Sequence, residues 1–362
     1  MNNGSVSMFQ VGMIFMLSTG LMNHVIIIPL VMDTAKRDGW ISVLVAGGLS
    51  LVWVALLALL ISGTGRGHFF AWLGKAYSPI IGRALAIVSC VYLLCLCGIT
   101  MRDTVTWIKL SFSPSLPTLV PAVLLVAVCA ANAYMGLRSL AYTAGILLPV
   151  VILLGLFVML ANVPHKHYFL LKPFLEYGMK PVWHGALYVS AGLLEVIMIL
   201  FMKHRIRSNV SFVSLGLLIV LLAGLTVGPI MGAIIEFGPD QAGKLRYPAY
   251  EEWRLVTIGR YIEHLDFLSI YQWFSGAFLR VSLTMYLIPE VLNMTSKRGK
   301  GWMLGAVSAV MVGIAVLPFS DPFFLSLLSR YAFPWIVWGV FGFSVVSAIL
   351  VYGSKLRRRV RA

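Results

Sequence analysis

The amino-acid sequence predicts an all-α polytopic membrane protein. Of its 362 residues, 60% are hydrophobic and only 11% are charged. A soluble domain carries roughly 25% charged residues, so this chain has too few to cover a globular surface in water. The composition also excludes a disordered chain, a scaffold of disulfides and a soluble nucleic-acid-binding module. Lipid is therefore the expected solvent, and residues 1–362 are expected to form a single transmembrane domain.

A third observation is a series of apolar runs, which predict about ten transmembrane helices. About 20 apolar residues suffice to cross a hydrocarbon core of about 30 Å. Each run is apolar on nearly all sides, whereas the buried helices of a soluble protein would need surrounding elements with polar faces, which are missing here. In chain order the predicted spans are 9–32, 40–62, 79–107, 118–137, 140–162, 182–203, 209–232, 266–292, 301–319 and 331–353.

The first run is expected to remain in the protein as a transmembrane helix. Residues 1–10 contain no Lys or Arg, and the apolar run that follows is too long for the short hydrophobic region of a cleavable signal peptide.

Motifs of catalysis and metal binding are missing from the sequence. The glycine-rich segment 63–67 follows a predicted membrane helix rather than a strand, so it is read as a loop and not as a phosphate cradle. His165 and His167 stand in a loop without a cluster of Cys or carboxylates. No Walker motif, nucleophile elbow or zinc spacing is present. We therefore expect no enzyme activity, no cofactor and no metal, and we interpret the four cysteines, all inside predicted spans, as small hydrophobic residues.

Basic residues are divided unevenly between the two sides of the predicted bundle. With ten spans both termini share a side, and that side carries about +15 against about +1 on the other. Because basic loops stay in the cytoplasm, the termini and the basic tail 354–362 are predicted to be cytoplasmic. The tail is interpreted as an orientation signal that contacts anionic membrane lipids, not nucleic acid.

Two of the predicted helices carry a small polar triplet at matching positions. Ser18-Thr19-Gly20 interrupts the first helix and Ser190-Ala191-Gly192 the sixth, 172 residues apart. This spacing is near half the chain and predicts two repeats, at about 9–162 and about 182–353. The second is inverted because five spans is an odd number. Broken helices at corresponding positions indicate a midplane substrate site. Small residues also permit close helix packing, which is the alternative; the matched spacing favours a site.

Two charged residues lie deep inside predicted spans. Arg280 is near the centre of the eighth helix, and Glu195 follows the second triplet by three residues. A charge at that depth costs several kcal/mol unless it is paired or hydrated. We expect Arg280 to meet Glu195, a helix carbonyl end or a bound carboxylate, so that a structural ion pair and a ligand contact both stay open.

Several other polar residues are candidates for pocket walls or for helix packing. Tyr92, Leu96 and Thr100 share one stripe of the third helix, and His24 of the first helix is read mainly as a helix–helix hydrogen-bonding residue. The eighth helix adds the hydroxyls of Tyr271, Ser275, Ser282 and Thr284.

The segment 233–262 is predicted to lie on the outer side, because it is too rich in charges of both signs to enter lipid. It contains Tyr247, Tyr250, Trp253 and Tyr261, which supply more aromatic surface than a linker needs. We interpret it as an ordered lid or partner-docking element; a passive linker is the alternative.

Two stretches of the chain carry the motifs of a known family. The first runs from Gln10 to Trp40, with the Ser18 triplet, Pro29 and the turn at Lys36. The second joins Tyr247-Pro248, the run 254–259, Glu263-His264-Leu265-Asp266, Trp273 and Arg280. Over essentially its whole length the chain resembles the endospore germination permeases, the B subunits of GerA-type nutrient receptors. His264 stands where that family often has Arg, Arg280 stands where Lys is common, and 255–257 departs slightly.

The resemblance implies a fold, a location and a site. The family belongs to the amino acid-polyamine-organocation transporter superfamily, which implies a LeuT-like inverted five-helix repeat with helices 1 and 6 broken. Its members act in the spore inner membrane beside an A subunit and a lipoprotein C subunit, and recognise small nutrients, often amino acids. The family's pocket lies between helices 1, 3, 6 and 8, which here implies Ser18, Thr19, Gly20, Leu21, Tyr92, Leu96, Ser190, Ala191, Gly192, Leu193, Leu194, Ser282 and Thr284.

The leading functional hypothesis is a receptor subunit in which nutrient binding shifts the balance between two helix packings and triggers germination. The alternative is an active secondary transporter that moves an amino acid with H+ or Na+. A scaffold with a vestigial pocket is the third hypothesis.

Overall fold

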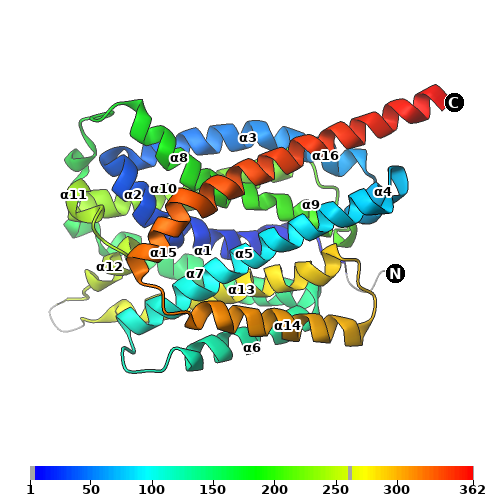
Figure 1. Cartoon of the computed structure of the whole chain (residues 1–362). Coiled ribbons are helices and arrows are strands. Elements are labelled where there is room, and N and C mark those ends of the chain that lie inside the picture. The colour runs from blue at the N-terminus through cyan, green and yellow to red at the C-terminus, as the bar shows by residue number, and fades with distance from the viewer. Residues whose placement is uncertain (1–4, 260–262, 362) are drawn as a thin grey trace.

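The computed structural model describes residues 5–259 and 263–361 of the chain. Most of this part is helical and it contains no β-strand; Val6 and Ile206 form an isolated bridge. By length and hydropathy, seven helical segments are able to cross a membrane. The prediction of an all-α polytopic membrane protein is confirmed (Figure 1).

The seven segments and two further helices account for the ten predicted spans. Met8–Gly63 contains two spans. Of the two further helices, Leu119–Met135 is shorter, and Leu268–Val291 is made more polar by Arg280 and Glu290. The spans are α1–α2 (Met8–Leu21, Ile28–Ala35), α3 (Gly39–Gly63), α5 (Pro79–Ser111), α6 (Leu119–Met135), α7 (Leu137–Ala161), α8–α9 (Met179–Leu193, Met198–Met202), α10 (Phe212–Phe237), α13 (Leu268–Val291), α14 (Lys297–Val316) and α16 (Phe333–Arg361). Short connecting helices are α4 (Phe69–Ala76), α11 (Pro239–Ala242), α12 (Pro248–Arg254) and α15 (Asp321–Leu327).

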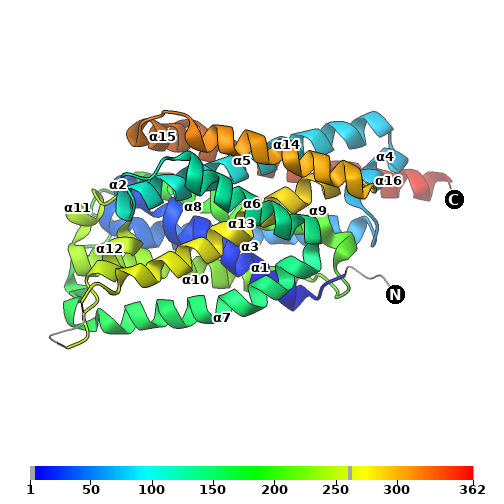
Figure 2. The same ribbon diagram turned by 90° about the horizontal axis from the view of Figure 1, so that it is seen from below.

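Helices at equivalent places in the two halves of the chain pack against each other. The second helices, α3 and α10, form one such pair, the third helices α5 and α13 another, and the fourth helices α6 and α14 a further one. The first helices of the two halves, α1–α2 and α8–α9, run in opposite directions (Figure 1). Turned by 90°, α1 and α13 run through the middle of the bundle, between α14 and α7 (Figure 2). These pairings are those that two inverted repeats would produce; the repeat boundaries stay a prediction.

The interruptions of the two central helices begin two residues after the predicted triplets end. The first is a π-helical stretch, Met22–Ile26, and the second a 3₁₀ stretch, Leu194–Ile197; both triplets remain α-helical. In the first helix the reason is Pro29, which has no N–H to donate, so that the turn before it re-forms with a wider hydrogen bond from Ile27 to Met22 (3.1 Å). The two stretches begin with the same spacing as the triplets.

Two glycines allow central helices to approach closely. At Gly192 of α8, a β-carbon would lie 1.7 Å from Oδ1 of Asn23. At Gly276 of α13, a β-carbon would lie 2.8 Å from Cβ of Leu21 and 3.3 Å from the backbone carbonyl oxygen of Leu17. The C-terminal end of α1 and the π-helical stretch after it are thereby held between α8 and α13, and the small residues act here as helix-packing positions.

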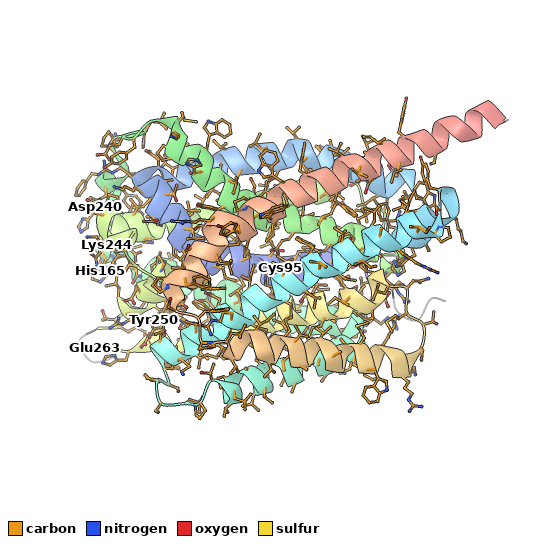
Figure 3. The ribbon with its side chains drawn as sticks, in the orientation of Figure 1. Cys95, His165, Asp240, Lys244, Tyr250 and Glu263 are labelled. Carbon is orange, nitrogen blue, oxygen red and sulfur yellow. The ribbon has the colours of Figure 1, made fainter. Side chains whose placement is uncertain are left out.

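The end of the bundle opposite the two termini is capped by the connection between α10 and α13. Tyr250 and Glu263 mark this end in Figure 3, together with His165. Residues 233–237 of the predicted outer segment belong to α10, and residues 238–259 form α11, α12 and loops. Tyr247, Tyr250 and Trp253 are buried. Residues 260–262, with Tyr261, lie outside the described part, as do the side chains of the basic tail beyond Ser354.

We expect Gly192→Ala to destabilise the fold because the Asn23 side chain would have to leave its place. Forcing an extra methyl group into a packed interior costs about 1–3 kcal/mol. The free energy of unfolding, measured by titrating detergent-solubilised protein with a denaturing detergent, should fall by that amount. The matched control is Gly342→Ala on α16, where a β-carbon meets nothing within 4 Å. A similar effect of both changes would contradict the close approach.

Candidate functional site

A fully buried ion pair stands at the centre of the bundle. The guanidinium of Arg280 on α13 donates from two nitrogens to the two carboxylate oxygens of Glu195, in the 3₁₀ stretch after α8. Both side chains are 1% exposed or less. A charge-assisted pair with two parallel hydrogen bonds is the strongest arrangement open to these groups at membrane depth.

Neighbouring helices supply the remaining hydrogen bonds of this pair. Nε of Arg280 donates to Oγ1 of Thr100 on α5 (2.7 Å), and Nη1 also donates to the carbonyl oxygen of Ser18 on α1 (3.3 Å). The Thr19 hydroxyl donates to Glu195 (3.2 Å). One network therefore joins helices 1, 3, 6 and 8 of the ten-helix order, and Arg280 meets two of the three partners that the sequence had left open.

The predicted site residues divide between this network and an adjacent cavity. Ser18 and Thr19 touch the ion pair, whereas Gly20 and Leu21 line the cavity described below. Thr284 directs its hydroxyl to the carbonyl oxygens of Arg280 (3.0 Å) and Val281 (2.9 Å) in its own helix. The other predicted positions of α5, α8 and α13 are mostly or fully buried: Tyr92, Leu96, Ser190, Ala191, Gly192, Leu193, Leu194 and Ser282.

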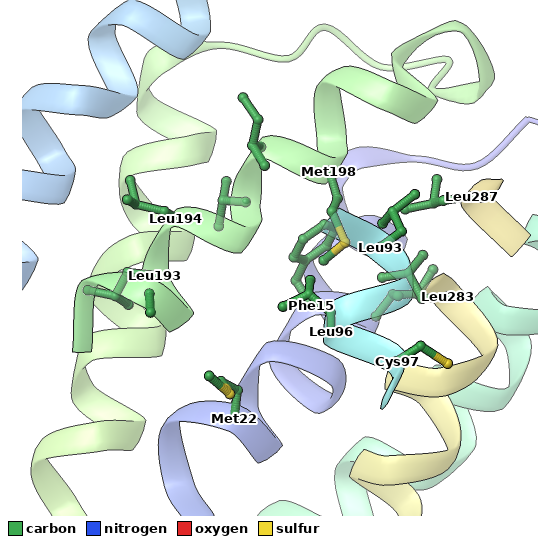
Figure 4. Packing of buried hydrophobic residues seen from close by; sticks show 14 of the residues in the cluster. Phe15, Met22, Leu93, Leu96, Cys97, Leu193, Leu194, Met198, Leu283 and Leu287 are labelled. Carbon is green, nitrogen blue, oxygen red and sulfur yellow. The ribbon is translucent and has the colours of Figure 1, made fainter. Parts of the chain in front are cut away.

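Hydrophobic side chains fill the space that these helices enclose. Leu96 and Leu93 of α5 meet Phe15 of α1 and Leu283 of α13, and Met198 of α9 approaches the same group (Figure 4). The structure thus brings the predicted helices together around the ion pair in a packed, closed arrangement.

Four polar side chains of this centre have no hydrogen-bond partner in the described part of the chain. The unpartnered atoms are the hydroxyls of Ser18, Tyr92 and Ser282 and both amide atoms of Asn23. A buried polar group without a partner costs about 1–3 kcal/mol. Sequence analysis missed Asn23; its position beside His24, in a helix otherwise apolar at this depth, was the available signal. His24 itself forms an interhelical hydrogen bond with the carbonyl oxygen of Leu225 (3.1 Å).

Ion pairs close the bundle at both of its ends. At the end opposite the termini, Arg246 pairs with Asp103 (2.6 Å) and Asp321 (2.7 Å). Burial alone would lower the pKa of Arg246, but these two carboxylates outweigh it and raise the pKa above its usual range. At the other end Glu290 accepts hydrogen bonds from Arg205 (3.1 Å) and Lys300 (2.7 Å).

A cavity of about 340 Å³ lies between α1, α7, α10 and α13 and is covered by α12. Gly20 and Leu21 contribute to it from the predicted site. No predicted site lay between α7 and α10, because these two helices carry no polar motif. The helix α12 lies outside the predicted spans. No cluster of three or more metal-ligating side chains occurs in residues 5–259 and 263–361.

A family model and two known proteins, all described as spore germination proteins, match most of this chain. The family model described as "Spore germination protein" matches residues 5–323. The chain is 43% identical over 354 residues to Spore germination protein XB of Bacillus anthracis, covering 98% of this chain and 99% of that protein. It is 23% identical over 281 residues to a putative spore germination protein, YfkT, of Bacillus subtilis strain 168, covering 76% and 75% of the two chains.

We expect Arg280→Met to destabilise the protein by about 3–5 kcal/mol, because it leaves the Glu195 carboxylate buried and unpaired. The double change Arg280→Met with Glu195→Leu should cost less than the two single changes together, since it removes both charges. Denaturing-detergent titration of the purified chain measures each free energy of unfolding.

The control for this cycle is Arg254→Met. Arg254 pairs with Glu251 at the surface, with 59% of its side chain exposed, so its loss should cost at most about 1 kcal/mol. Additive effects in the Arg280–Glu195 cycle would show that the two groups do not stabilise each other.

Proposed function

This chain belongs to the spore germination protein family of membrane permeases, and we propose that it is the B subunit of a nutrient germinant receptor. In this role it binds a small nutrient such as an amino acid in the centre of the bundle. Its partners are an A subunit and a lipoprotein C subunit in the spore inner membrane. The excess of basic residues on one side supports cytoplasmic termini.

The observation that carries this proposal is the Arg280–Glu195 pair with its unpartnered neighbours. An amino acid has a carboxylate that competes for Arg280 and an ammonium that competes for Glu195. The Ser18 and Tyr92 hydroxyls and the Asn23 amide have hydrogen-bonding capacity left for the same ligand. Exchange of protein partners for ligand partners keeps every buried charge paired.

Ligand binding then shifts the balance between two packings of the same helices. The closed packing has its ion pair intact and its centre filled with hydrophobic side chains. A ligand that takes over the charges favours a second packing in which α1, α5 and α13 move apart, and it does so by its higher affinity for that packing. The partner subunits respond to the change.

An active ion-coupled amino acid transporter is the second candidate function. It is supported by the pairing of equivalent helices from two halves and by the matched interruptions at Met22–Ile26 and Leu194–Ile197. Accumulation of an amino acid against its gradient in proteoliposomes that contain only this chain would favour transport over sensing alone.

We expect Leu96→Ala and Thr284→Leu to change the nutrient dose that triggers germination by about tenfold, which corresponds to about 1.4 kcal/mol of binding. The first empties and the second fills space beside the ion pair. Gly20→Ala tests the adjoining face of α1 without a clash, since the added carbon lies 3.6 Å from Leu225. The assay follows germination of spores from strains that carry each variant, with single nutrients.

Gly342→Ala serves as the control for assembly, because it lies on α16 away from the centre. If the three variants assemble with their partner subunits and leave both nutrient specificity and sensitivity unchanged, the pocket is vestigial and the protein acts as a scaffold.

A further inference from the structure

The cavity beside α1 contains a carboxylate that its surroundings do not balance. Glu252 of α12 lines this cavity, is 8% exposed, and its Oε1 atom has no hydrogen-bond partner in the described part of the chain. Its side chain has no ion-pair partner there either. Burial of an ionised carboxylate without a partner is strongly unfavourable, so this group calls for a cation or a proton.

A second carboxylate in the same cavity already has an ion-pair partner. Glu236 of α10 lies 3.8 Å from Nζ of Lys166 and accepts a hydrogen bond from Asn162 (3.1 Å). Asn162 also donates to the backbone carbonyl oxygen of Glu252 (2.7 Å), which fixes α12 over the cavity. When Glu252 is ionised, two carboxylates and one ammonium leave one negative charge for a bound cation to balance.

The backbone of α10 is shaped to hold the Glu252 side chain. At Gly232, a β-carbon would lie 2.7 Å from Oε1 of Glu252, closer than real contacts allow. The absence of a side chain at this position lets the carboxylate lie directly against the helix. Burial, and next the neighbouring charge of Glu236, raise the pKa of Glu252 well above its usual range, while Lys166 lowers it by less. A bound cation would reverse this shift.

The remaining walls decide what kind of cation fits. They are mostly apolar, with Leu21, Val25 and Leu148 among them, and they include the rings of Tyr250, Trp253 and Trp273. A metal ion would need several oxygen ligands, and the described part of the chain contains no group of three or more His, Cys, Asp or Glu side chains that could hold one. Aromatic rings and one carboxylate instead suit an ammonium group on a hydrocarbon body. The volume of about 340 Å³ is in the range of small-molecule sites.

We propose that this cavity is a second ligand site, separate from the Arg280–Glu195 centre, that binds a small protonated alkylamine with its ammonium on Glu252. The hydrocarbon part lies among the apolar side chains of α1, α7 and α10. The site stands on its own contacts and does not depend on nutrient binding at the centre.

The test measures binding of butylamine to the full-length chain in lipid nanodiscs by isothermal titration calorimetry at neutral pH, where the amine is protonated. The matched probe is 1-butanol, which has the same hydrocarbon body and no charge. We expect the wild-type chain to bind butylamine about tenfold or more tightly than 1-butanol. Equal affinities, or no measurable binding of butylamine, would overturn the proposal.

Glu252→Gln should abolish the preference for the amine, because it removes the charge and keeps the shape. Its control is Glu251→Gln, the adjacent residue on the same helix, whose carboxylate pairs with Arg254 at the surface. The control should bind both probes as the wild-type chain does. An unchanged preference for the amine in Glu252→Gln would overturn the proposal.

A third variant keeps the test decisive if Glu252→Gln fails to fold. Gly228→Leu places a side chain in the cavity from α10, and a β-carbon at Gly228 meets nothing within 4 Å. It should bind neither probe measurably while its thermal unfolding stays close to that of the wild-type chain. Butylamine binding that persists in this variant would place the ligand elsewhere and would overturn the proposal.

Discussion

The structure depends on one ion pair that lipid and protein together isolate from water. Arg280 and Glu195 are fully buried, and in that environment neither charge is tolerable without the other. The hydrogen bonds that complete the pair come from Thr19, Thr100 and the Ser18 carbonyl. Helices 1, 3, 6 and 8 must therefore meet at one point, and the surrounding helices pack around that constraint.

The close approach of the central helices follows from this requirement. A guanidinium reaches a carboxylate on another helix and a carbonyl on a third only when the helices are near each other. Gly192 and Gly276 permit this, the first against Asn23 and the second against Leu21. Within residues 5–259 and 263–361, the same tight packing leaves polar atoms of Asn23, Ser18 and Tyr92 without hydrogen-bond partners. The centre thus combines a satisfied pair of charges with neutral groups that have unused hydrogen-bonding capacity, which suits a structure with two alternative packings.

Helix α1 connects the Arg280–Glu195 centre with the cavity that α12 covers. Ser18 and Thr19 contact the ion pair, while Gly20 and Leu21 line the cavity that α12 covers. The π-helical stretch begins at the next residue, Met22. Successive residues of a helix point in different directions, so one turn of α1 contacts both the centre and the cavity. A shift of this turn would change the contacts of both.

Much of the fold was open to prediction from sequence because its causes are local. The length of an apolar run must match the thickness of a bilayer, so the apolar runs and the composition predicted the spans and the all-α class. Arg280 and Glu195 stood out because a charge in such a run is expensive.

Other features required the tertiary structure. Pro29 was visible in the sequence, yet only the folded helix shows that the interruption lies at Met22–Ile26 and that the triplet before it stays helical. The choice of Glu195 as the partner of Arg280, the burial of Glu252 and the position of the cavity all depend on contacts between helices far apart in the chain. The sequence by itself determined which residues are costly to bury. The packing of distant helices decided which groups balance that cost, because the partners of a buried charge come from other parts of the chain.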